Sequence, residues 1–227
     1  IIVPVFNEEK TISLLIKKIL NVSLDKEIII VNDGSTDKSL TEIQKYRTHL
    51  KQIIVHDKNL GKGAAIKSAI VHVAGDIVII QDGDLEYDPS DYESLIQPII
   101  DDKTEVVYGS RVLGKKRYLN DDFTSWFRTF ANHALTIISN FINNQSLTDA
   151  HTCYKVFKTS IFKSIKLIEN DFSFCPEVTT KLSNNNIKSF EVPITYKGRR
   201  IDEGKKIRFK DAIKALFVLI KYKYFIK

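Results

Sequence analysis

Short apolar runs alternate with helical segments over the first 110 residues, and this alternation constrains the fold more than any other feature of the chain. The runs are rich in Ile and Val and predict strands at Ile1–Val5, Glu27–Asn32, Gln52–His56, Asp76–Gln81 and Glu105–Ser110. Helices are predicted between them at Glu9–Leu20, Lys38–His49, Lys62–Val73 and Ser90–Asp101, the last with Ser90 and Glu93 as a capping box. This order predicts an α/β fold with a mostly parallel sheet, whose ligands bind beyond the carboxyl ends of the strands.

The second half of the chain has longer helical patterns and fewer strands. The predicted elements are helices at Thr124–Asn143, Ser160–Leu167, Glu177–Asn184 and Phe209–Tyr224, strands at Thr152–Phe157 and Ser189–Tyr196, and a charged loop at Lys197–Lys206. The sequence contains no internal repeat and no low-complexity linker, so a single domain over residues 1–227 is the simpler prediction.

Composition limits the class of protein and its partners. Hydrophobic residues make up 43% of the 227 residues, which is enough to supply a core, and the net charge of +6 favours anionic partners such as phosphates or an acidic membrane surface. The lysines are spread along the chain without a nucleic-acid-binding motif, so nucleic acid is not expected as a partner. Cys153 and Cys175 have neither metal-ligand nor disulfide spacing and are interpreted as reduced thiols.

Two carboxylates, Asp82 and Asp84, follow a buried apolar run with only Gly83 between them. Neighbouring carboxylates repel each other unless a cation lies between them, and oxygen ligands suit Mg²⁺ or Mn²⁺ together with substrate phosphates. The pattern therefore indicates a site for a metal ion and a diphosphate. Taken alone, the same tripeptide is also compatible with an ordinary turn.

Three more polar segments follow predicted strands, at Pro4–Glu8, Val31–Asp37 and Asn59–Ala65. The carboxyl ends of parallel strands lie at one edge of a sheet, so all four segments are expected to converge on one crevice. Acids and amides there can bind a base and a ribose, and Gly61 and Gly63 allow backbone amides to approach a ligand before a helix. Each segment by itself is equally compatible with a turn or a cap.

The four motifs, in this order, resemble the signature of family 2 glycosyltransferases with the GT-A fold. Downstream segments resemble the dolichyl-phosphate mannose synthase-like branch of that family: Tyr108–Arg111, Leu147–Asp149, Cys153–Phe157, Glu191–Ile194 and Gly204–Ile207. The resemblance covers nearly the whole chain. It implies a Rossmann-like mixed sheet flanked by helices, with a nucleotide-sugar-binding half at residues 1–112. The other half, residues 113–227, would bind the acceptor and end in an amphipathic helix.

The resemblance also implies roles for residues on the donor side. The nucleotide pocket would be lined by Pro4, Phe6, Glu8 and Asp33, with Lys62 in the same substrate-binding set. Asp82 and Asp84 would act in catalysis by holding Mg²⁺ or Mn²⁺ and the sugar diphosphate. Glu86 stands where the branch often has Gln, and it can add a third metal ligand. Phe6 replaces a tyrosine common in the branch, so it can stack but cannot donate a hydrogen bond.

On the acceptor side, the resemblance places Arg111, Arg128 and Asn132 around the acceptor phosphate, with Arg111 counted among the catalytic residues. Arg128 and Asn132 are four residues apart, and therefore share one face of a helix. Arg199 and Lys206 would close over the diphosphate, with Lys205 as the alternative to Lys206. His151 and Thr152 lie next to the expected acceptor site, either as pocket wall or as loop.

The implied reaction is an inverting, metal-dependent transfer of a hexose from a UDP- or GDP-sugar to a polyprenyl or dolichyl phosphate. A phosphate oxygen is already ionised near neutral pH and needs no general base, whereas a saccharide hydroxyl acceptor would need one. Glu177 and Asp149 are the candidates for that base, and a helix-start carboxylate and a turn cap are their ordinary interpretations. The rival functions are transfer to a hydroxyl, a nucleotidyltransferase, and a non-catalytic subunit that binds nucleotide sugars.

Two helical segments suggest where a lipid acceptor would be met. The segment around Trp126 is more apolar than a solvent-facing helix requires, and the C-terminal segment combines aromatic residues with lysines. Both patterns favour peripheral binding to the cytoplasmic face of a membrane. Packing within the domain, against a homodimer partner or against a membrane protein is the alternative. No apolar run approaches the roughly 20 residues that span a bilayer.

Overall fold

The computed structural model describes residues 1–113, 123–199 and 209–226, with the backbone alone for 123–129 and 209–211. A parallel sheet contains β1 (Ile2–Val5), β2 (Ile29–Asn32) and β3 (Gln52–Val55), with β2 in the middle. A second sheet has the order β4-β6-β5-β7, made of β4 (Ile77–Ile79), β5 (Val106–Ser110), β6 (Lys155–Lys158) and β7 (Phe190–Pro193).

The two sheets meet at a parallel bridge between Ile2 and Ile80, where the amide of Gln81 also donates to the carbonyl of Ile2 at 2.9 Å. In the second sheet β5 and β7 are parallel, whereas β6 is antiparallel to both of its neighbours. The mixed, mostly parallel α/β architecture predicted from the sequence is confirmed, and β6 is the strand that runs in the opposite direction.

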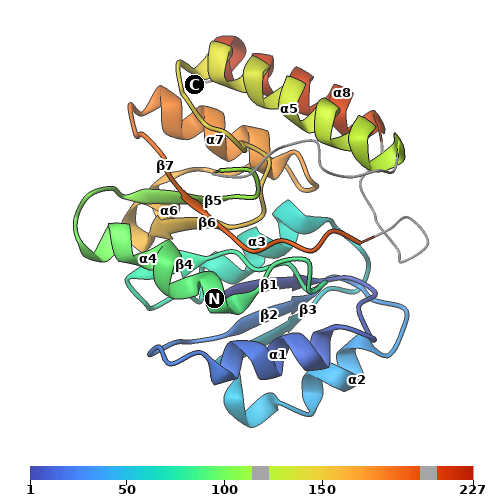
Figure 1. The fold of residues 1–227 in the computed structure, drawn as a ribbon. Helices are drawn as coiled ribbons and strands as arrows, with labels where there is room; N and C mark the ends of the chain where they lie inside the picture. Colours follow the sequence, from blue (N-terminus) through green and yellow to red (C-terminus); the bar gives the residue numbers. More distant parts are fainter. Residues whose placement is uncertain (114–122, 200–208, 227) are drawn as a thin grey trace.

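Helices cover the sheets on both faces (Figure 1). In the first half, α1 (Ile12–Asn21) and α2 (Ser39–Gln44) lie on one side of the parallel sheet, and α3 (Lys62–Ile70) lies on the other. The side of α1 that faces the core repeats at helical spacing and consists of Ile12, Leu15, Ile16 and Ile19. The predicted capping box is wrong: Asp88 instead accepts the amide of Ser90 at 3.0 Å and caps a 3₁₀ turn, so that α4 begins at Tyr92 and ends at Ile100.

In the second half, α5 (Phe123–Asn143) and α8 (Phe209–Ile220) lie side by side on the outside of the molecule (Figure 1). Both pack on α7 (Phe174–Asn184), and α7 is tied to β5 by a 2.9 Å hydrogen bond between the hydroxyls of Tyr108 and Thr179. The short α6 (Thr159–Ser164) follows β6, and a π-helical turn, Lys221–Phe225, follows α8. The two cysteines are free and buried, as expected of reduced thiols.

A fully buried glutamine, Gln81, supports the segment that carries the two predicted site aspartates. Its amide oxygen accepts hydrogen bonds from Tyr92 at 2.8 Å and Tyr154 at 2.6 Å, and its amide nitrogen donates to the carbonyl of Asp82 at 2.9 Å. Buried polar groups need such partners, because an unsatisfied one costs about 1–3 kcal/mol. The core therefore fixes the backbone from which Asp82 and Asp84 project.

Candidate active site

Three carboxylates from two different strand ends surround the guanidinium of Arg199. Glu8 follows β1, and it receives hydrogen bonds from both terminal nitrogens of Arg199, at 3.0 and 3.1 Å. Asp84 follows β4 and accepts from Nη2 at 3.0 Å, and Glu86 accepts the Arg199 backbone amide at 2.8 Å. The predicted convergence of these strand-end motifs therefore produces an acid cluster, Glu8, Asp84 and Glu86, closed by a cation that follows β7.

The acid cluster carries more negative charge than Arg199 balances. Burial raises the pKa of Asp84 to about 7, and the charges of Asp82 and Glu86 act in the same direction, while Arg199 opposes them. Carboxylate oxygens are the ligands that Mg²⁺ and Mn²⁺ prefer, so the chemistry of this donor set fits a divalent ion. Among the described residues no ready-made group of three ligands is present, because the guanidinium stands where the carboxylates meet.

Asp82 has a different cation from its neighbour. Its carboxylate lies 2.5 Å from the ammonium of Lys62, the first residue of α3. Burial would lower the pKa of Lys62, but the charge and hydrogen bond of Asp82, together with the nearby Cys153 and Cys175, outweigh burial and raise the pKa well above the usual value. Lys62 also donates to the sulfur of Cys153 at 3.4 Å. Asp82 and Asp84 are thus held by two separate cations at one edge of the sheet.

Asp33, predicted for the nucleotide pocket, is buried and bonded to the loop that precedes α3. Its oxygens accept the amides of Leu60 at 2.9 Å and Gly61 at 2.8 Å, and a ring nitrogen of His56 lies 2.6 Å away. Gly61 has a φ of +99°, and a side chain there would come within 2.5 Å of the Asn170 carbonyl oxygen. The structure therefore gives Asp33 a structural role in shaping this loop, and its contact with a nucleotide stays a prediction.

The predicted acceptor residue Arg111 forms a two-pronged ion pair with Asp149. Nε and Nη2 of Arg111 lie 2.6 and 2.8 Å from the two carboxylate oxygens, and the side-chain amide of Asn132 donates to the same carboxylate at 3.2 Å. Burial alone would raise the pKa of Asp149, but the charge and hydrogen bonds of Arg111 lower it to about 2. Asp149 is therefore an anion at neutral pH that orients Arg111, and so low a pKa does not favour its alternative role as a general base.

The other candidate base, Glu177, is also fully engaged. Its oxygens accept the amides of Ile168 at 2.7 Å and Glu169 at 2.9 Å, and Lys181 lies at 2.6 Å. The carboxylate is completely buried and fixes the turn before α7. The structure thus supports the ordinary structural interpretation of Glu177.

The structure describes some of the remaining residues that were predicted for the site, but not all of them. Pro4 lies within β1 and Phe6 directly after it, at the strand end that carries Glu8. His151 and Thr152 each bury a polar atom without a hydrogen-bond partner among the described residues, and burial lowers the pKa of His151 to about 4. The side chain of Arg128, together with Lys205 and Lys206, lies outside what the structure describes.

Three residues that the sequence did not single out support these groups. The carboxylate of Glu191 accepts the amides of Thr148 at 2.7 Å and Asp149 at 2.9 Å. The fully buried ammonium of Lys155 donates to the carbonyls of Ala150 at 3.1 Å and Thr152 at 2.6 Å. A signal for Lys155 was present in the sequence, because a lysine inside an apolar strand is unusual. For the third residue, Tyr196, the sequence contained no such signal. Its hydroxyl donates to Glu86 at 2.6 Å.

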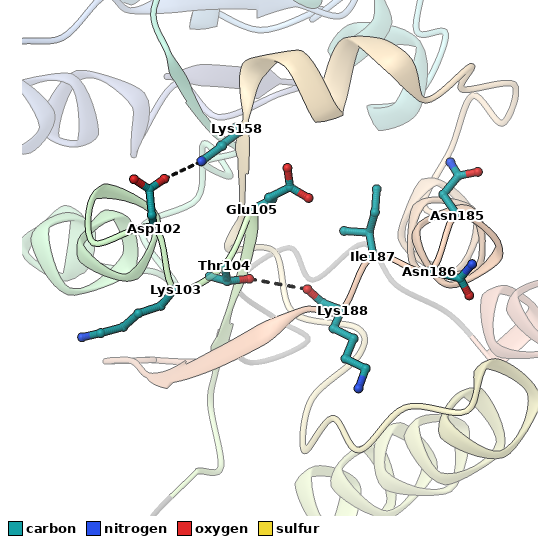
Figure 2. Close-up of a pocket in the computed structure, with 9 residues that line it drawn as sticks. All are labelled: Asp102, Lys103, Thr104, Glu105, Lys158, Asn185, Asn186, Ile187 and Lys188. Atoms are coloured by element: carbon teal, nitrogen blue, oxygen red, sulfur yellow. Dashed lines mark hydrogen bonds and ion pairs between the residues drawn. The ribbon is translucent and has the colours of Figure 1, made fainter.

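A shallow polar hollow of about 460 Å³ lies at the opposite end of β5 from Arg111. Figure 2 shows that its side chains come from the turns before β5 and β7 and from the end of β6. Lys158 reaches across to Asp102 at 2.7 Å, and Thr104 donates to the carbonyl of Lys188 at 3.5 Å. No predicted site residue lines this hollow, so it is separate from the acid cluster.

Residues 1–166 match the family model described as "Glycosyl transferase family 2". A UDP-N-acetylglucosamine–dolichyl-phosphate N-acetylglucosaminyltransferase of Methanococcus voltae is 29% identical over 86% of this chain and 83% of its own length. A dodecaprenyl-phosphate galacturonate synthase of Rhizobium johnstonii is 28% identical over 78% of this chain, which spans only about half (52%) of that relative. A dolichyl-phosphate beta-glucosyltransferase of Trichomonas vaginalis is 28% identical over 99% of this chain and 72% of its own length.

Among solved structures, glucosyl-3-phosphoglycerate synthase of Mycobacterium tuberculosis superposes with a TM-score of 0.70. That structure contains Mn²⁺, uridine diphosphate and phosphoglyceric acid. The two proteins share 16% sequence identity, and the match covers 98% of this chain and 77% of the other. At this level of identity the likeness establishes a common fold.

Proposed function

Because the chain belongs to glycosyl transferase family 2 and is therefore a glycosyltransferase, we propose that it transfers a hexose from a UDP- or GDP-sugar to a polyprenyl or dolichyl phosphate. The three relatives described above are all named for transfer to, or synthesis of, such a lipid phosphate. Their names differ in the sugar, so the proposal stops at the class of hexose. The observation that carries it is the placement of the acid cluster and Lys62 at one strand edge, with Arg111 as a cation on the acceptor side.

On the donor side, Asp82 and Asp84 would hold Mg²⁺ or Mn²⁺, with Glu86 close by. A divalent ion bound there would neutralise the negative charge that develops on the leaving nucleoside diphosphate. Lys62 pairs with Asp82, and Arg199 would exchange carboxylate oxygens for diphosphate oxygens when the donor binds. These groups are fixed before the reaction, so they stabilise developing charge without reorganising.

On the acceptor side, Arg111 would bind the lipid phosphate while Asp149 holds its guanidinium in one orientation. Arg111 uses Nε and Nη2 for its two hydrogen bonds to the Asp149 carboxylate. The third guanidinium nitrogen of Arg111, Nη1, has no hydrogen-bond partner among the described residues. The phosphate oxygen would attack the anomeric carbon in line with the departing diphosphate, and this inverts the anomeric configuration. Such an acceptor needs no general base, in keeping with the engaged oxygens of Asp149 and Glu177.

A lipid acceptor implies contact with a membrane, and α5 and α8 offer an apolar surface. Phe141 on α5 is 88% exposed, and Phe217 on α8 is 66% exposed. Lys214 and Lys223 lie in the same C-terminal region, but Lys214 is already paired with Asp171. We therefore expect the aromatic side chains to provide most of the attraction to the membrane. No helix in the described part of the chain is long and apolar enough to cross a bilayer. We propose that the protein contacts the cytoplasmic face of the membrane through this apolar surface.

The proposal is tested with purified protein, radiolabelled UDP- and GDP-sugars, Mn²⁺ or Mg²⁺, and a polyprenyl phosphate. We expect label to enter the organic phase together with release of a nucleoside diphosphate. A parallel reaction replaces the lipid with phosphoglycerate or a free saccharide. Label that appears only in a water-soluble product would favour a soluble acceptor, and release of pyrophosphate would indicate a nucleotidyltransferase.

A further inference from the structure

Tyr196 lies between the acid cluster and the acceptor arginine, and it contacts both. Its hydroxyl donates to Oε2 of Glu86 at 2.6 Å, while the Cζ atom of Arg111 lies 5.1 Å from the centre of its ring. A cation at that distance from an aromatic ring is attracted by the negative charge of the ring face. The Tyr196 side chain thus binds the Glu86 carboxylate through its hydroxyl and the Arg111 guanidinium through the face of its ring.

The backbone around Tyr196 is held in place independently of these two contacts. Tyr87 and Tyr196 form an antiparallel bridge with their rings 5.1 Å apart, and the amide of Lys197 donates to the Glu86 carbonyl at 2.9 Å. The ring is therefore a fixed spacer.

Glu86 links Tyr196 to the residues on the donor side. While Oε2 accepts the tyrosine hydroxyl, Oε1 accepts the backbone amide of Arg199 at 2.8 Å, and the Glu86 amide donates to Asp84 at 3.1 Å. On the other side, Arg111 is fixed by its two bonds to Asp149. The chain of contacts from Asp84 to Asp149 passes through Glu86, Tyr196 and Arg111.

We propose that Tyr196 is a positioning residue, which sets the spacing between the donor acids and Arg111 and so aligns the acceptor phosphate with the donor diphosphate. The inference rests on the proposed function, because it assigns the two ends of this spacer to the two substrates. Alignment matters since in-line attack requires the reacting atoms to lie about 3–3.5 Å apart. The same geometry explains a glutamate at position 86, since a carboxylate can accept both the tyrosine hydroxyl and the Arg199 amide.

Two substitutions separate the two contacts. Tyr196→Phe keeps the ring under Arg111 and loses the bond to Glu86, so we expect the donor KM to rise about tenfold while the acceptor KM stays unchanged. Tyr196→Leu loses both contacts, and we expect the acceptor KM to rise as well, by about three- to fivefold. Tyr46→Phe is the matched control, because it removes a hydroxyl that is hydrogen-bonded at 2.8 Å to Ser13.

Results of three kinds would overturn the inference: unchanged kinetics in Tyr196→Phe, a parallel change in both KM values in that variant, or a lowered melting temperature as the sole effect. If Tyr196→Leu does not fold, Tyr196→Phe alone decides, since it keeps the packed ring. The affinities of wild type and Tyr196→Phe for UDP and GDP with Mn²⁺ are measured by calorimetry. If wild type transfers no sugar to lipid phosphate, the proposed function fails, whereas this affinity ratio still tests the hydroxyl's effect on the donor side.

Discussion

Arg199 binds Glu8 through both terminal nitrogens, at 3.0 and 3.1 Å, although 191 residues separate the two in the chain. Glu8 is 5% exposed, so this ion pair is largely removed from water, and its guanidinium is shared with Asp84 at 3.0 Å. A buried charge that loses its partner is strongly destabilising, so these carboxylates depend on a cation. In the absence of substrate Arg199 supplies it.

The acid cluster should be indispensable for transfer. We expect Asp84→Asn to lower kcat by about 10²–10³-fold, because the divalent ion that would neutralise the leaving diphosphate loses a carboxylate ligand. Circular dichroism should show an intact fold. Asp88→Asn is the control, since Asp88 lies on the same segment but caps a turn and pairs with Lys18 at 2.6 Å. Wild-type turnover by Asp84→Asn, with Mn²⁺ or Mg²⁺ present, would refute the assignment of the metal site.

Asp149 should make stability depend on pH in the acid range. Its pKa is about 2 in the folded protein and about 3.9 in an unfolded chain, so its ion pair stabilises above pH 4 and loses that contribution as the pH falls toward 2. We expect the difference in unfolding free energy between wild type and Asp149→Asn to shrink between pH 5 and pH 3. Asp102→Asn, which changes an 81% exposed carboxylate, should show no such trend. A constant difference would contradict the ion-pair account.

Lys155 should matter for the loop before β6. Replacing it with Met leaves the carbonyls of Ala150 and Thr152 without their donor, and we expect a loss of about 1–3 kcal/mol in urea unfolding. Lys158→Met, on the same strand, removes a lysine that pairs with an exposed carboxylate and should cost less than about 0.5 kcal/mol. Equal effects of the two substitutions would mean that burial of Lys155 has no special importance.

Gly61 should tolerate no side chain. Its φ of +99° is unfavourable for other residues, and a Cβ would lie 2.5 Å from the carbonyl oxygen of Asn170. We expect Gly61→Ala to cost more than about 1 kcal/mol in thermal unfolding, because strain adds to the steric clash. At Gly75 the closest atom to a Cβ is 4.0 Å away, so Gly75→Ala should change stability by at most about 0.5 kcal/mol.

The exposed aromatics of α5 and α8 should control membrane binding. We expect Phe141→Glu combined with Phe217→Glu to reduce flotation with anionic vesicles by more than about tenfold, since burial of each phenylalanine contributes about 1.5–3 kcal/mol. Transfer to a short-chain, water-soluble polyprenyl phosphate should persist. The control is Val71→Glu, which changes a 73% exposed apolar residue just after α3. If wild type and the double variant float alike, this surface does not face the membrane.

Sequence reasoning predicted the elements and the convergence of Glu8, Asp82 and Asp84, because strand-end position follows from apolar periodicity alone. The family resemblance is confirmed by the model match over residues 1–166. Neither the sequence pattern nor the resemblance predicted which side chains pair with one another within the site. The partners Glu86 and Tyr196 are 110 residues apart, and the loop conformation that consumes the oxygens of Asp33 depends on the backbone at Gly61.

The contacts of Arg199 with residues near the N-terminus determine when the donor pocket can be completed during synthesis. Synthesis begins at the N-terminus, so Glu8, Asp84 and Glu86 leave the ribosome long before the arginine that neutralises them. Until then the half-made chain holds three crowded carboxylates that disfavour a compact state. Completion of the donor pocket is thus deferred to the arrival of β7 and the segment behind it.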